Sequence, residues 1–145
     1  MRTKSLIAVA LLSTISLAVS VPAIAANPAH VRRLLETKEC SGCDLTGANL
    51  KGAHLIGADL RKANLKGANL QNTNLEGADL TGANLQSANL TKAFVNSTTL
   101  SNANLTNANL TNASLSSADV DNAILVGINL SGAEIYNTNI SVGGE

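Results

Sequence analysis

The chain has 145 residues, with ten basic and ten acidic side chains, one Tyr, one Phe and no Trp. This length allows a single domain, and the balanced charge offers no basic stripe of the kind that nucleic-acid binding requires. The scarcity of aromatic residues excludes an aromatic-rich core and a surface on which bases stack.

Residues 1–25 have the three-part form of a secretory signal peptide. A basic start leads into an apolar run from Leu6 to Val21, and a small-residue site ends at Ala25. A membrane anchor is the alternative, but the run is shorter than the roughly 20 apolar residues that span a bilayer, and hydroxyl residues interrupt it. We therefore expect cleavage between Ala25 and Ala26, which leaves a mature protein with no membrane-spanning segment.

Residues 26–39 are predicted to form a short helix. The Asn-Pro pair near its start is typical of a helix N-terminus, because Asn caps the first turn and Pro fits within it. Val31, Leu34 and Leu35 recur at helical spacing and predict one apolar face. We expect that face to pack on the first part of the segment that follows.

Cys40 and Cys43 form a CxxC pair directly after this helix. Three interpretations are open: a structural disulfide, a redox pair like that of thioredoxin, and a zinc site. A redox pair is expected in a different setting, near a βαβ pattern, and only His30 and His54 are available as further zinc ligands. Export favours oxidation, so we expect a disulfide that pins the helix to the next segment.

A five-residue repeat occupies the remainder, residues 40–145. An apolar residue stands at every fifth position from Leu45 to Ile140, and sixteen of these twenty are Leu. The residue two places earlier is Ala in fifteen cases. A five-residue step would spiral around an α-helix and alternate between the faces of a flat strand. The chain must therefore bend once per unit, at the Gly and Asn residues that follow each Leu, and stack on itself as a solenoid.

The tandem motif A-[DN]-L-x-x, as in residues 48–52, resembles the pentapeptide-repeat family throughout residues 43–142. The resemblance implies an all-β fold, a right-handed quadrilateral β-helix with four units per coil and hence about five coils, with the N-terminal helix as a short cap. Exported chains that share this cap, Cys pair and repeat are abundant in cyanobacteria. The resemblance thus implies a periplasmic or thylakoid-lumen protein, or an extracellular one, that is a structural or protein-interaction module without enzymatic activity or cofactor.

Residues twenty apart would stack into columns if each coil holds four units. One column is Asn throughout, and we expect its side chains to form an amide ladder of the kind that stabilises stacked chains. Another column places Asp59 above Asp79, a pair able to attract a cation unless Arg61 and Lys62 neutralise it, as we expect. The Asn column consists of Asn49, Asn69, Asn89, Asn109 and Asn129.

Six apolar residues depart from the pattern and are candidates for an interaction surface. They occupy outward or corner positions that elsewhere carry polar residues or Ala, and the last repeats lead into 142–145 with no sign of a second capping helix. Irregular packing is one interpretation. The other is a surface for an unknown protein partner, or for self-association through an uncapped C-terminal end. The six are Ile56, Phe94, Ile124, Val126, Ile128 and Tyr136.

Other functions find weaker support in the sequence. There is no Ser-His-Asp arrangement, no Gly-rich phosphate loop and no dense cluster of metal ligands, so we expect no catalytic site. A DNA-mimicking protein that binds gyrase is the main alternative function, but it requires a more acidic chain in the cytosol. Ice binding requires regular Thr arrays, whereas the Thr residues outside each Leu are scattered: Thr46, Thr81, Thr91, Thr106 and Thr111.

Overall fold

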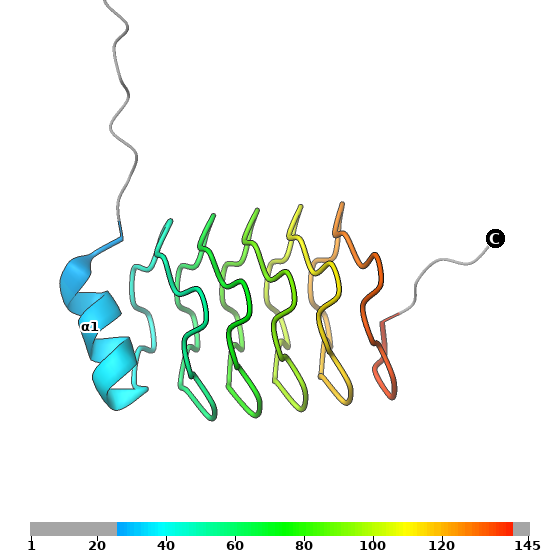
Figure 1. The fold of residues 1–145 in the computed structure, drawn as a ribbon, viewed down its shortest axis with the longest axis horizontal. Helices are drawn as coiled ribbons and strands as arrows, with labels where there is room; N and C mark the ends of the chain where they lie inside the picture. Colours follow the sequence, from blue (N-terminus) through cyan, green and yellow to red (C-terminus); the bar gives the residue numbers. More distant parts are fainter. Residues whose placement is uncertain (1–25, 141–145) are drawn as a thin grey trace, which may run out of the picture.

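The computed structural model describes residues 26–140. The predicted signal peptide and its cleavage position at Ala25 lie outside these residues. One helix, α1 (Pro28–Thr37), lies across the end of a stack of coils whose last turn is at the opposite end of the molecule (Figure 1). In this part of the chain no helix is both long and apolar enough to cross a membrane.

The coils are held together by parallel bridges between residues twenty apart, from Glu39 with Asp59 to Ser114 with Glu134. A coil therefore contains four five-residue units. Each bridge is isolated, and no longer strand forms within 26–140. The units stay short because the second residue after each axial Leu has a positive φ, as at Gly57 (φ 65°) and Lys92 (φ 57°), and this left-handed residue turns the chain.

Each unit buries two side chains. Leu85 fills the axis and Ala83 fills the corner, both with no exposed surface. The corner is tight because the amide of Ala83 donates to the carbonyl of Leu80 at 2.9 Å, while the amide of Leu85 donates to Asn104 in the next coil at 2.7 Å. The core is therefore a stack of aliphatic layers enclosed by hydrogen-bonded backbone.

Thr takes the place of Ala at three corners, and two of these, Thr73 and Thr98, lie inside the stack. The hydroxyls of Thr73 and Thr98 donate to the carbonyls of Leu50 and Leu75 in the preceding coil, both at 2.8 Å. Both Thr residues are fully buried. Their polar groups are thus satisfied, as burial requires.

The coils begin one unit earlier than the run of leucines indicates. Glu39 pairs with Asp59, and the amide of Cys40 donates to the carbonyl of Asp59 at 2.8 Å. Cys40 is fully buried and occupies the axial position that Leu fills elsewhere. Cys43 occupies the corner position of the next unit, where Ala is usual. One cysteine is therefore an axial residue, and the other is the corner residue of the following unit.

Helix α1 begins at a cap formed by Asn27, whose side-chain oxygen accepts from the amide of Ala29 at 3.0 Å. Leu34 is completely buried, as the sequence predicts. The prediction of a single apolar face is wrong for Leu35, which is 45% exposed. Neighbouring helical residues point about 100° apart, so one face cannot bury both.

Burial of the core decreases in the last turn. Val120 is 6% exposed, whereas the later axial residues Leu125, Leu130, Ile135 and Ile140 are only partly buried. No described residue lies over them (Figure 1). The two ends of the stack therefore differ, because α1 covers the first coil.

Candidate functional site

The C-terminal end, defined here as the half-buried axial residues of the last turn with Ile124 and Val126 beside them, is an open edge of the coil. In the middle of the stack the amide of Leu90 donates to Asn109 at 2.7 Å. The corresponding amides of Leu130 and Ile135 have no acceptor within residues 26–140. An apolar surface with unpaired backbone groups favours pairing with another chain.

Three of the six candidate residues lie at this end. Ile124 and Val126 project outward and are 48% and 68% exposed. Ile128 is half-buried and packs against the core, because it replaces a corner Ala. The C-terminal end therefore gathers apolar side chains from the surface and from the core.

The other three candidates share one side of the coil but form no continuous patch. Ile56, Phe94 and Tyr136 are each at least half exposed. Bridges place Phe94 between Asn74 and Ser114, and polar residues fill the positions between these apolar side chains. This side face offers single apolar contacts only.

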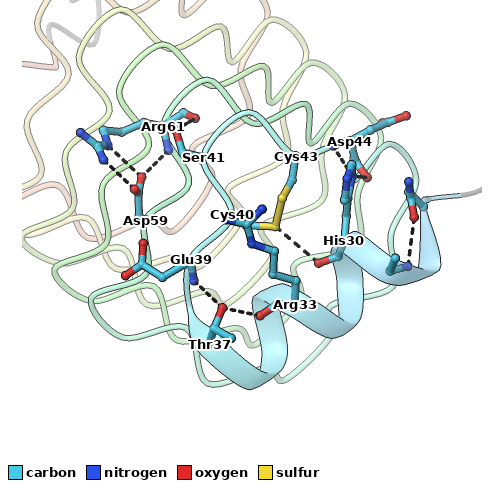
Figure 2. Close-up of a disulfide and its surroundings, with 12 residues drawn as sticks. His30, Arg33, Thr37, Glu39, Cys40, Ser41, Cys43, Asp44, Asp59 and Arg61 are labelled. Carbon is cyan, nitrogen blue, oxygen red and sulfur yellow. Dashed lines mark hydrogen bonds and ion pairs between the residues drawn. A yellow bond between two sulfur atoms is a disulfide. The ribbon is translucent and has the colours of Figure 1, made fainter.

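The junction between α1 and the first coil has a disulfide and a histidine (Figure 2). Cys40 and Cys43 are joined by an S–S bond. The sulfur of Cys40 lies 3.4 Å from the carbonyl oxygen of His30. This is a van der Waals contact and not a hydrogen bond, because a disulfide sulfur has no proton to donate. The amide of Asp44 donates to Nδ1 of His30 at 2.9 Å. The hydrogen bond from Asp44 thus attaches the helix to the first coil through the side chain of His30.

Asp44 also organises its own turn. Its carboxylate accepts from the hydroxyl of Thr46 at 2.7 Å and from the amide of Thr46 at 3.1 Å. These hydrogen bonds, the hydroxyl first, lower the pKa of the Asp44 carboxyl below its ordinary value. The carboxylate at this junction is therefore stabilised in its charged form.

A groove runs along α1 and reaches Asn49 of the first coil, and the sequence did not predict it. Its volume is about 540 Å³, and its lining is mainly apolar. The signal that would have revealed it is the spacing of Pro28, Val31 and Leu35, which lie three and four residues apart. The lining residues are Ala26, Pro28, Val31, Arg32, Leu35, Glu36 and Asn49.

The acidic pair Asp59 and Asp79 contacts Arg61, one of the two basic residues that were expected to neutralise it. Arg61 Nη2 lies 2.6 Å from Oδ2 of Asp59, and Nε of Arg61 lies 3.8 Å from Oδ2 of Asp79. The hydrogen bond from Arg61 lowers the pKa of Asp59 to about 2, and Asp59 raises that of the guanidinium in turn. Within 26–140, no group of three or more His, Cys, Asp or Glu residues is placed to hold a metal ion.

The amide ladder predicted for the Asn column is wrong. The side-chain oxygen of each of these residues accepts from the backbone amide two residues later, as in Asn89 with Thr91 at 3.1 Å. The nearest donor belongs to the same unit, and the resulting Asx turn shapes the bend. The other bonds of this kind join Asn49 to Lys51, Asn69 to Gln71, Asn109 to Thr111 and Asn129 to Ser131.

The scattered Thr residues have the same local role. The hydroxyl of Thr106 donates to Oδ1 of Asn104 at 2.7 Å, and that of Thr81 donates to Oδ1 of Asp79 at 2.6 Å. Thr46, Thr91 and Thr111 do the same. These hydroxyls stabilise their own turns, so the structure gives them a role that involves no external ligand.

Comparisons with known proteins identify what this architecture is similar to. The sequence profile of the family "Pentapeptide repeats" matches in eight copies over residues 39–77, 60–102, 78–116, 96–125 and 113–141. A search of curated proteins found no significant match.

Solved structures give the same result. A pentapeptide repeat protein from the thylakoid lumen of Arabidopsis thaliana is 34% identical, with 72% of this chain and 70% of that chain covered and a TM-score of 0.50. One from Nostoc PCC 7120 is 32% identical, with 78% and 98% covered and a TM-score of 0.64. The plasmid-mediated fluoroquinolone resistance protein QnrB1 is 20% identical, with 69% and 61% covered and a TM-score of 0.43.

Proposed function

The chain belongs to the pentapeptide-repeat family, and from that premise we propose that it is a non-enzymatic structural or protein-interaction module of an exported compartment. Members of this family form right-handed quadrilateral β-helices. In this proposal residues 1–25 are a cleaved signal peptide, residues 26–39 are a capping helix, and residues 40–145 form about five coils. The protein binds other proteins through its C-terminal end.

The proposal rests on the contrast between the two ends of the coil. At the first coil, α1 buries Leu34 and supplies an acceptor for the amide of Asp44. At the last turn the axial residues are half-buried and the amide of Leu130 has no described acceptor. Solenoids require a polar covering at their ends. A partner that binds at the C-terminal end would bury these axial side chains and pair the free amides, so this end is the most favourable binding surface.

An exported location is consistent with two features. The Arabidopsis relative is a pentapeptide repeat protein of the thylakoid lumen. The arrangement of Cys40 and Cys43 suits a disulfide, and we propose that this bond forms in the cell, since disulfides persist in oxidising compartments and are rare in reducing ones. We propose the periplasm or the thylakoid lumen, with secretion to the exterior as the remaining destination.

The DNA-mimicking alternative is less well supported. Residues 93–140 contain three acidic residues and no basic one, too few to imitate the dense negative charge of a duplex. The similarity to QnrB1 carries no argument about function at its identity and TM-score. Detection of the protein in the cytosol would revive this alternative.

Site-specific photo-crosslinking in the producing cell tests the proposal. A photoreactive amino acid placed at Val126 should yield crosslinks to protein in the exported fraction. The matched control is Gln86, which lies in the same column two coils below. Crosslinks from Val126 and not from Gln86 are expected. Equal yields from both positions, or none from Val126, would overturn the assignment of the C-terminal end as the binding surface.

A further inference from the structure

Helix α1 is apolar on two sides. Its inner side buries Leu34 against the first coil. Its outer side carries Pro28, Val31 and Leu35 at the spacing of a single helical stripe. This outer stripe lines the 540 Å³ groove, and 45% of Leu35 is exposed there. Val31 packs partly against the core, whereas Leu35 stays exposed. A cap whose only partner is its own coil needs one apolar side, so the exposed part of this stripe is available to a further partner.

The C-terminal end has the kind of surface on which α1 already packs. At the first coil, aliphatic side chains along the axis meet Leu34 of the helix. At the last turn the same type of axial side chain, represented by Leu130 and Ile135, is half-buried and uncovered by residues 26–140. A second apolar helix face fits this surface by its chemistry.

The two ends also carry opposite charge. Residues 26–66 contain seven Lys and Arg against four Asp and Glu, a net charge of +3. Residues 93–140 contain three acidic residues and no basic one, a net charge of −3. Like charges would meet if two C-terminal ends packed together, whereas opposite charges meet when one C-terminal end approaches the α1 end of another copy.

We propose that this protein assembles head to tail, with the C-terminal end of one copy packed in the groove beside α1 of the next. This inference rests on the proposed interaction role and names a second copy of the chain as the partner. The contact joins two different surfaces. Every assembly therefore keeps a free groove at one end and a free C-terminal end at the other, and further copies can add to form rows of variable length. Because opposite charges contribute, added salt weakens the assembly.

Sedimentation of the purified exported protein across a range of concentrations tests the assembly. Two double variants block one end each. Arg32→Glu with Leu35→Glu alters the groove, and Val126→Lys with Glu134→Lys alters the C-terminal end. The control is Glu76→Lys, an exposed charge reversal in the middle of the coil. The unfolding midpoint of each variant establishes that it is folded.

We expect the unmodified protein and the control to gain mass with concentration and to lose it with salt. Each double variant alone should remain monomeric, and an equimolar mixture of the two should associate because one unaltered contact is restored. A groove variant that still dimerises alone would show tail-to-tail packing and overturn the inference, as would an unmodified protein that is monomeric throughout. If that monomer still crosslinks to a different protein from Val126, the proposed function stands and the head-to-tail contact fails.

Discussion

The imidazole of His30 accepts a hydrogen bond from the backbone amide of Asp44 at 2.9 Å (Figure 2). In later coils the equivalent amide donates to a corner carbonyl of the coil below, as Asn64 does to Cys43 and Asn84 does to Ala63. The first coil has none below it. One side chain of α1 thus occupies the place of a missing coil.

Replacing His30 with Ala should lower the free energy of unfolding by about 1 kcal/mol, because the edge amide of Asp44 loses its acceptor. Urea unfolding measures this change, and hydrogen exchange at Asp44 should accelerate. His54→Ala is the control, since His54 is exposed. Equal effects of the two substitutions would contradict the role of His30.

The cysteine positions predict how the disulfide can be replaced. Cys40→Leu with Cys43→Ala installs the residues that the repeat uses at its axial and corner positions. This double variant should fold and should be more stable than Cys40→Ala with Cys43→Ala, because the latter leaves a cavity at the axis. Unfolding in denaturant compares them. The disulfide closes a short loop, so its loss alone should cost about 2 kcal/mol. A Leu variant less stable than the Ala variant would show that Cys40 is not an axial residue.

The stability lost when an axial leucine is replaced by Ala should depend on the coil in which the leucine lies. Leu85→Ala in a fully buried layer should cost about 2–5 kcal/mol, since the rigid coils above and below cannot close the cavity. Leu130→Ala at the open end should cost clearly less, because Leu130 is only partly buried. Thermal unfolding of both variants checks the gradient, and equal losses would contradict the open end.

The ion pair between Arg61 and Asp59 makes a prediction about acid stability. Its hydrogen bond lowers the pKa of Asp59 from 3.8 to about 2. The folded state therefore favours the charged form, and this stabilisation is complete above the unfolded value and disappears as pH falls towards 2. Arg61→Met should flatten the pH dependence of the unfolding midpoint in that window. The change in stability should be small, because the side chain of Arg61 is largely exposed to solvent, which screens the interaction. An unchanged pH profile would show that Arg61 does not set this pKa.

The sequence predicts the core because the same two inward positions recur every five residues, as Leu85 and Ala83 show. It does not predict that Cys40 occupies an axial position, since a cysteine is not recognised as an axial residue until its backbone pairing is seen. The Asn column illustrates a different limit. Stacking of residues twenty apart was predicted correctly from the four units per coil that the family resemblance implies. The amide two residues along the chain, however, is the nearer partner for each Asn side chain.

The candidate site was likewise predictable from the sequence only in part. Exposure of Ile124 and Val126 was predictable, because both stand at positions that point outward in every coil. The groove along α1 was not, because Val31, Leu34 and Leu35 are all apolar and the sequence does not reveal which of them the first coil buries. The structure assigns Leu34 to the coil and leaves Leu35 in the groove.

Hydrogen exchange at the amides of Leu130, Gly132 and Ile135 tests the central claim, that the C-terminal end is a binding surface. These amides have no acceptor within residues 26–140. In dilute purified protein they should exchange quickly, and in an extract of the exported compartment they should become protected while the already bonded amide of Leu90 stays unchanged. Protection that is complete in dilute protein, or that never develops in the extract, would contradict the claim.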